Sequence, residues 1–201
     1  MTPAKLKRIT HLEKGTHSPD STWCLMEAVA YVAGESWSDS PECTCPVLAS
    51  YGRALNDYMP DDQRQRLIPL IPKLIGTKAG REVELRRAYL LVDVAVRGLA
   101  PMALRAAHLD EEAHNLASLP EITNAVAARS AWAAARSALA TAWAAEATAW
   151  AARAAARSAW VAARSAEAAA EAAAEVAAEV AAPWDVAIDA FERAIAIKET
   201  S

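Results

Sequence analysis

The sequence predicts an all-α protein in which a compact helical domain precedes one long, alanine-rich helix. Residues 127–182 repeat in units of seven without Gly or Pro, and Ala, the best helix former, dominates them. Six Gly, one Phe and few β-branched runs argue against a sheet. We therefore expect a flexible basic arm at 1–20, a helical domain at 21–119, the long helix at 121–182 and a return helix at 184–198.

The first fifty residues supply the arm and one helix. The arm is polar, and no apolar stretch follows its basic residues, so it does not resemble an export signal. Asp20 or Ser21 then offers an N-cap for an apolar helix. Gly34 is expected to end that helix, because Gly readily takes the left-handed conformation of a helix C-terminus.

Proline and glycine divide the rest of the helical domain. Pro46 is expected to open a helix through about Tyr58, and two prolines must kink or shorten a third helix at 61–75. Residues 82–99 form the most apolar helix, which is expected at the centre of the domain. Two shorter helices are expected to follow, the first from Pro101 and the second from Asp110 to about Leu119.

The seven-residue repeat gives the long helix two unlike faces. Its second and fifth positions are almost always Ala, whereas the bulky residues occupy the third and sixth positions. The first and fifth positions meet in a seam opposite the bulky residues. A strict seven-residue repeat keeps such a seam facing a partner helix, so the smooth alanine face is expected to pack closely against another helix. The rough face carries the predicted partner-binding residues, which are Trp132, Arg136, Trp143, Trp150, Arg153, Arg157 and Trp160.

The rough face has two interpretations. A Trp row at helical spacing most often belongs to a core, here against the N-terminal domain or the return helix, but an exposed row would bind a partner. Arg dominates the first five units of the repeat and Glu the last three. An antiparallel copy would bring these opposite charges together. We therefore expect an antiparallel homo-oligomer, with another protein as a further candidate partner.

The return helix follows a forced break. Pro183 ends the repeat, and Trp184, Ile188, Phe191 and Ile195 then recur at helical spacing. This helix is expected to fold back onto the core.

Composition argues against several partners. The net charge of -4 and pI of about 5.6 leave no basic footprint for nucleic acid. No uncharged apolar run reaches the roughly 18 residues that a membrane helix needs. Three cysteines are too few for a disulfide framework, which favours the reducing cytoplasm.

One stretch resembles a known group of proteins. The motif Cys24-Leu-Met-Glu-Ala28, then Ala33-Gly-Glu35 with Trp37-Ser-Asp39, Pro41, Cys43 and Pro46, is similar to the opening of bacterial and phage-encoded proteins with Ala-rich C-terminal halves. That group has no established activity, so the resemblance implies no function. The Ala/Arg/Trp half has a weaker similarity to Ala-rich immunity-protein-like domains.

Acidic residues gather around the end of the first helix and the loop after it. Glu27 is the only charge in its helix. The simplest interpretation is structural pairing, in which Arg53 neutralises Glu27, or Arg97 pairs with Asp93 at i,i+4. The alternative is a ligand pocket formed by Glu27, Trp37, Asp39 and Arg53.

Cys43 and Cys45 are the weak candidates for a metal site, with Cys24, His17 or His11 as further ligands. The C-x-C spacing differs from the usual C-x2-C zinc motif, and no second pair follows. We therefore expect no metal and no cofactor.

The functional expectation is a non-catalytic binding or assembly protein that self-associates through the long helix. The alternative is a small-molecule-binding or immunity and anti-defence type of protein with a pocket in the N-terminal domain. No recognisable nucleophile, phosphate loop or metal motif occurs, so we do not expect an enzyme.

Overall fold

The computed structural model describes residues 3–15, 22–106, 108–144 and 184–198, and all regular elements in these ranges are helical. The N-terminal elements are α1 (Pro3–Leu6), α2 (Leu25–Ala33), α3 (Pro46–Tyr58), α4 (Asp61–Arg64), the 3-10 helix η1 (Gln65–Leu70) and α5 (Ile71–Leu74). They are followed by α6 (Arg81–Asp93), the π-helix η2 (Val94–Leu99), α7 (Ala100–Ala106), α8 (Asp110–Ala117), α9 (Ala125–Ala144) and α12 (Trp184–Ala196). The predicted all-α class is confirmed.

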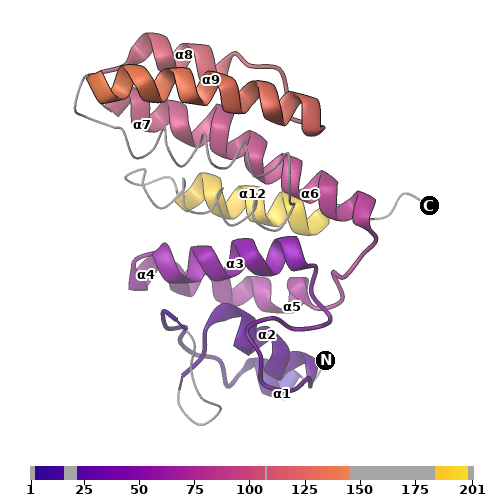
Figure 1. The fold of residues 1–201 in the computed structure, drawn as a ribbon. Coiled ribbons are helices and arrows are strands. Elements are labelled where there is room, and N and C mark those ends of the chain that lie inside the picture. Colours follow the sequence, from indigo (N-terminus) through magenta and orange to yellow (C-terminus); the bar gives the residue numbers. More distant parts are fainter. Residues whose placement is uncertain (1–2, 16–21, 107, 145–183, 199–201) are drawn as a thin grey trace.

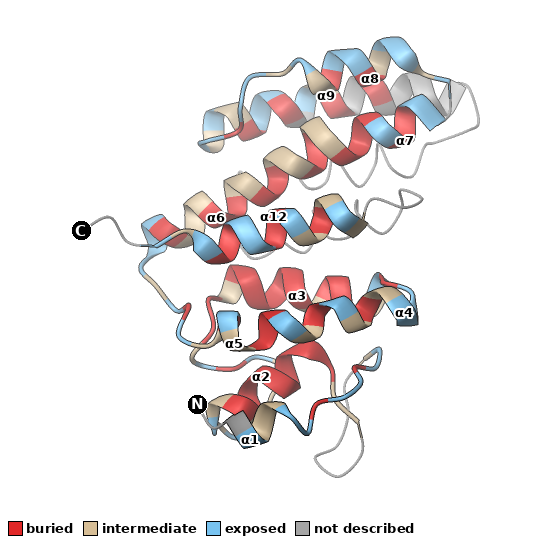
Figure 2. Cartoon of the chain, turned by 180° about the vertical axis from the view of Figure 1, so that it is seen from behind, coloured by how far each residue is buried: buried red, intermediate tan, exposed pale blue. Residues whose placement is uncertain are grey.

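The helices form an elongated stack (Figure 1). At one end α1 and α2 lie below α3 and α5, and at the other end α8 and α9 lie on α7. Buried residues follow the interior of this stack from end to end (Figure 2). A single apolar core runs from Ile9 to Ile195 and includes alanines of α9 as well as Phe191 of α12. The sequence-predicted divisions near residues 120 and 183 therefore do not interrupt the core.

The first long helix has an unexpected N-cap. Cys24 takes this position instead of Asp20 or Ser21, because its sulfur accepts from the Glu27 N–H at 3.4 Å and its own N–H donates to the Glu27 carboxylate at 2.8 Å. This reciprocal pair is a capping box, which satisfies two N–H groups of the first turn. The predicted end of the helix is confirmed, since Gly34 has a φ of 85°.

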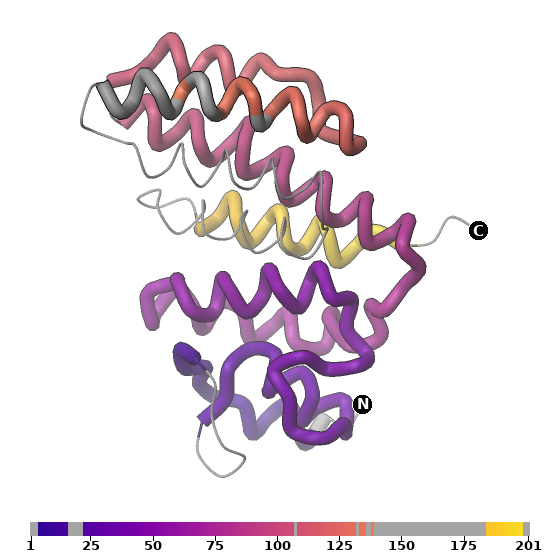
Figure 3. Tube along the Cα trace, in the orientation of Figure 1, coloured from indigo at the N-terminus to yellow at the C-terminus, as the bar shows by residue number. Residues whose placement is uncertain are grey.

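The prolines act in two ways. As predicted, those between residues 61 and 75 divide the segment into α4, η1 and α5. Pro101, however, does not start a separate helix, because α6, η2 and α7 form one uninterrupted helical run (Figure 3). In a regular α-helix the ring of Pro101 would clash with the carbonyl of Arg97. The wider π turn immediately before it accommodates the ring.

The predicted arm is packed over residues 3–15. Lys5 Nζ donates to the Tyr31 carbonyl at the end of α2 at 2.9 Å, and the Gly15 N–H donates to the Asp57 carboxylate at 2.8 Å. Leu12 is fully buried in the core. This segment therefore covers α2 and the end of α3.

The return helix folds back onto the core, as predicted. α12 lies between α3 and the α6–η2 run, although more than 80 residues separate it in sequence from both (Figure 1). The Tyr51 hydroxyl donates to the Ala187 carbonyl at 3.2 Å, and the Tyr51 and Phe191 rings lie 5.3 Å apart. Burial raises the pKa of Tyr51 well above its usual value, so this hydroxyl remains a donor.

A glycine allows α12 to come this close to α3. A Cβ added at Gly52 would lie 3.1 Å from Phe191 Cζ and 3.0 Å from Met26 Cε, closer than ordinary van der Waals contact. A larger residue at this position would require the side chains of Phe191 and Met26 to shift by a few tenths of an ångström. Gly52 is therefore a point of close contact between three helices.

The alanine seam packs closely, but against the same chain. The fifth-position alanines of the predicted seam, Ala131 and Ala138, are buried, and so are the second-position alanines Ala128 and Ala135. The first-position alanines Ala127 and Ala134 are half-buried, and Arg129 and Ala133 on the other side are exposed. Within the chain, α9 contacts α8. The helix begins at Ala125 rather than residue 121, and the predicted continuation through residues 145–182 lies outside the described residues.

This packing predicts unequal effects of leucine on the two sides of α9. Ala135→Leu, at a fully buried position, should overpack the seam and lower the free energy of unfolding by about 1 to 3 kcal/mol. Ala133→Leu, at an exposed position of the same helix, should change it by less than about 0.5 kcal/mol. Urea denaturation measures both values. Equal effects would contradict burial of the seam against α8.

Candidate functional site

The four residues predicted to form a pocket do not share one. Glu27 belongs to the capping box of α2, and the Trp37 ring packs on the Trp23 ring at 4.9 Å. Arg53 does meet Asp39, but through the backbone, since its Nη1 donates to the Asp39 carbonyl at 2.9 Å. Of the four predicted residues, Arg53 alone lines a cavity that we describe below.

The other predicted pairing is present. Arg97 Nη1 lies 2.9 Å from the Asp93 carboxylate, which also accepts from the Ile122 N–H at 2.9 Å. This ion pair has a structural role, because it fixes the segment that leads into α9.

The cysteines are structural in the described region. Burial raises the pKa of the Cys24 thiol to about 12, and burial together with a hydrogen bond donated to the Glu35 carboxylate raises the pKa of Cys43. Both thiols are therefore protonated at neutral pH. Cys45 is buried as the N-cap residue of α3. Within the residues that the structure describes, no group of three His, Cys, Asp or Glu side chains is arranged to hold a metal ion.

A cavity with basic walls lies beside the C-terminal end of α12. It has a volume of about 950 Å³, which is at the upper end of the range for small-molecule sites. We call it the basic cleft. Its charged side chains are Lys73, Lys78, Arg87, Glu192 and Lys198.

The loop between α5 and α6 forms one wall of the basic cleft and is held firmly. Gly76 has a φ of 75°, which Gly adopts without strain. The Thr77 hydroxyl donates to the Leu74 carbonyl at 2.7 Å and accepts from the Cys45 N–H at 3.1 Å. The Lys78 N–H donates to the Cys43 carbonyl at 3.1 Å. Lys78 is therefore carried by a loop fixed to the N-terminus of α3.

Arg87 forms the floor of the basic cleft. It is only 2% exposed, and its guanidinium donates to the carbonyls of Thr77 at 2.6 Å, Ala194 at 3.1 Å and Ile197 at 2.7 Å. A buried cation costs several kcal/mol unless other groups compensate it. Here the carbonyls at the end of α12 do so, since the C-terminus of a helix carries partial negative charge. Arg87 thus joins the α5–α6 loop to α12.

The charges of the basic cleft are unbalanced. Lys73 Nζ lies 2.6 Å from the carboxylate of Glu192, so these two neutralise each other. In the part of the chain that the structure describes, no carboxylate pairs with Lys78, Arg87 or Lys198. The basic cleft therefore has a positive potential and favours an anion.

The side chains of the basic cleft are suited to binding. Among the lining residues that the structure describes, the one hydroxyl, that of Thr77, is engaged as both donor and acceptor in holding the loop. The one carboxylate in this described lining is paired with Lys73. Ammonium and guanidinium groups hold phosphates and carboxylates through charge-assisted hydrogen bonds.

Sequence reasoning missed the basic cleft because its residues come from distant segments. Residues 73–87 and 192–198 are joined only through the docking of α12. The remaining signal in the sequence was weak. It consists of a short G-T-K-A-G segment between two helices and of Lys198 just after the C-terminal end of the tail helix.

Comparison with protein-family models, curated proteins and solved structures finds no match for this chain. None of the described helices is long and apolar enough to cross a membrane.

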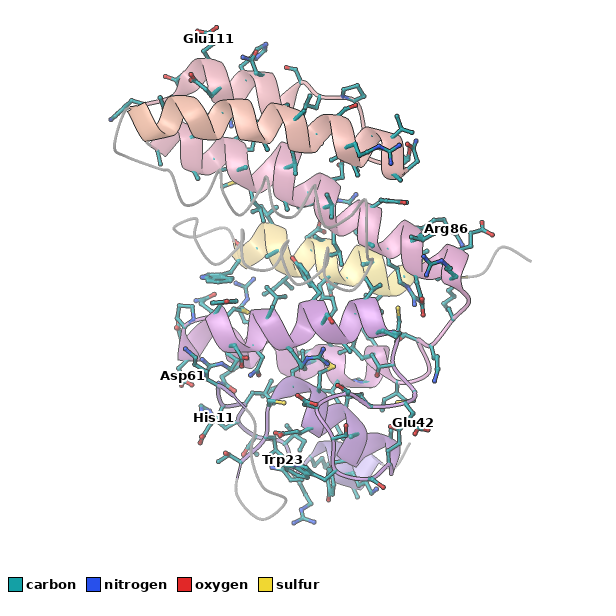
Figure 4. The ribbon with its side chains drawn as sticks, viewed as in Figure 1. His11, Trp23, Glu42, Asp61, Arg86 and Glu111 are labelled. Carbon is teal, nitrogen blue, oxygen red and sulfur yellow. The ribbon has the colours of Figure 1, made fainter. Side chains whose placement is uncertain are left out.

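The two neighbouring arginines of α6 should differ sharply in their effect on stability. Arg86 lies at the same end of α12 (Figure 4), but its Nη2 makes a single exposed bond to the Lys198 carbonyl at 2.8 Å. Arg87→Met should lower the free energy of unfolding by about 4.5 kcal/mol or more, because charged hydrogen bonds contribute about 1.5 to 3 kcal/mol each and three are lost. Arg86→Met should cost less than about 1 kcal/mol. Equal losses in thermal and urea denaturation would contradict the assigned role of Arg87.

Proposed function

We propose that this protein is a non-catalytic binding protein that holds an anionic small molecule in the basic cleft. The supporting observation is that Lys78, Arg87 and Lys198 meet in one cavity while no described carboxylate pairs with them. A cavity of this volume accommodates a small organic anion. Binding such a ligand requires no catalytic group among the lining residues.

The two lysines have different roles from the arginine. Arg87 is buried and already donates hydrogen bonds to three carbonyls. It therefore attracts an anion through its positive charge rather than through new hydrogen bonds. Lys78 and Lys198 are exposed and their ammonium groups are available to a ligand. Because exposed charges are screened by salt, binding should weaken as ionic strength rises.

The first test uses inorganic pyrophosphate as the probe at constant ionic strength. Isothermal titration should show binding to the wild type, and saturation should raise the melting temperature by several degrees, since ligand at 100 times its Kd adds about 2.7 kcal/mol. The double variant Lys78→Gln/Lys198→Gln should raise the Kd at least tenfold, which corresponds to about 1.4 kcal/mol.

The matched control is Lys7→Gln/Lys14→Gln, which removes the same charge at exposed positions outside the basic cleft. It should bind pyrophosphate as the wild type does. The proposal is wrong if pyrophosphate does not bind, or if both double variants lose affinity equally.

Assembly through the alanine-rich repeat is a second candidate function. It is supported by the outward face of α9, where Arg129 is exposed and Val126 is 63% exposed. The side chains of the predicted partner-binding residues Trp132, Arg136 and Trp143, and the whole of Trp150, Arg153, Arg157 and Trp160, lie outside the described residues. The seam of α9 is covered within the chain, so a partner of this helix would contact the outward face.

The antiparallel arrangement can be tested by charge reversal. Arg129→Glu/Arg136→Glu should weaken self-association in light scattering at low salt, and adding Glu167→Arg/Glu171→Arg should restore it, because exposed pairs contribute about 0.2 to 1 kcal/mol each. This second function would be excluded if the wild type is monomeric in light scattering. It would also be excluded if neither charge reversal changes self-association.

A further inference from the structure

A second cavity adjoins the basic cleft at Lys78. It has a volume of about 250 Å³ and lies between the segment before α3 and the α5–α6 loop. Lys78 lines both cavities, so this residue lies between them. Arg53 and Glu42 supply the other charges of the second cavity. Figure 4 shows Glu42 on the same edge of the molecule as Arg86.

Arg53 is oriented but not neutralised. Its Nη1 donates to the Asp39 carbonyl at 2.9 Å and the Ser40 hydroxyl at 3.1 Å, and its Nη2 donates to the Ser50 hydroxyl at 3.1 Å. All three acceptors are uncharged, and no carboxylate pairs with Arg53 among the described residues. A guanidinium has five N–H donors, so some remain for a ligand.

The second cavity is too small to be a separate ligand site. Small-molecule pockets usually have volumes of about 300 Å³ or more. As an extension of the basic cleft it has room for one anionic group near Arg53. The lining of the combined site then contains the cations Arg53, Lys78, Arg87 and Lys198, together with the Lys73–Glu192 ion pair and the carboxylate of Glu42.

We infer that the two cavities form one elongated site whose ligand is a small molecule with two separated anionic groups, phosphates or carboxylates. This inference rests on the proposed function of the basic cleft. One anionic group lies in the basic cleft near Lys198, the other lies near Arg53, and Lys78 contacts the ligand between them. A compact anion engages only one end of this site.

The fixed position of Lys78 supports a single elongated site. The hydrogen bonds from the Lys78 N–H to Cys43 and from the Cys45 N–H to Thr77 tie the α5–α6 loop to the segment that lines the second cavity. Both walls therefore keep their spacing before a ligand arrives. Such preorganisation reduces the entropy lost on binding.

The test compares pyrophosphate with tripolyphosphate and longer linear polyphosphates at constant ionic strength. For the wild type, affinity should rise about tenfold or more once the chain reaches Arg53. Arg53→Gln should remove this rise and weaken the long chains more than pyrophosphate. Arg53→Lys, which keeps the charge but loses the fork of donors, should retain part of it.

The matched control is Arg105→Gln, which removes an exposed arginine of α7 far from both cavities. It should leave the dependence on chain length unchanged. Thermal denaturation of each variant checks that the fold is retained. If pyrophosphate binds and depends on Lys78, but Arg53→Gln and Arg105→Gln weaken long chains equally, the elongated site is wrong while the proposed function stands. If pyrophosphate itself fails to bind, both are wrong.

Discussion

The buried guanidinium of Arg87 is the interaction on which the centre of this fold depends. α12 approaches α6 from a distant part of the chain, and its last carbonyls need partners once the helix ends. Arg87 supplies donors for Ala194 and Ile197 while the helix terminus compensates its charge. Neither group is stable in the interior without the other. Apolar packing by Phe191 and the close approach at Gly52 then complete the contact on the side of α3.

The same interaction creates the candidate site. Because Arg87 also bonds to Thr77, the end of α12 and the α5–α6 loop form opposite walls of the basic cleft. The carbonyls that hold Arg87 are neutral groups, so its positive charge is stabilised without being cancelled by a carboxylate. An anion in the basic cleft therefore experiences the field of Arg87 as well as direct contact with Lys78 and Lys198. Structural and binding roles are joined in one buried side chain.

Local features of the fold could be predicted from the sequence, whereas the site could not. The helix start at Pro46, the stop at Gly34 and the amphipathic helix after Pro183 depend on backbone preferences and short-range periodicity, which the sequence records directly. In the sequence Arg87 is one of several charged residues of its helix, and only the tertiary arrangement shows that carbonyls from 107 and 110 residues away surround it. The Glu27 carboxylate, which the sequence suggested for a pocket, is engaged in its own helix cap. An acidic cluster in sequence does not distinguish capping from ligand binding.

The alanine repeat shows a related limit. Small residues along the predicted seam of first and fifth positions predict a close neighbour but not which helix it is, because an alanine surface carries little shape or charge to discriminate partners. In α9 the neighbour is α8 of the same chain. That helix has 8 residues, which is a length of about 12 Å, whereas the sequence repeats the seam through residue 182. The alanine seam of the repeat is therefore longer than α8 can cover. Packing within the chain accounts for its first units, and this surplus is the sequence feature that keeps assembly through the later units as a proposal.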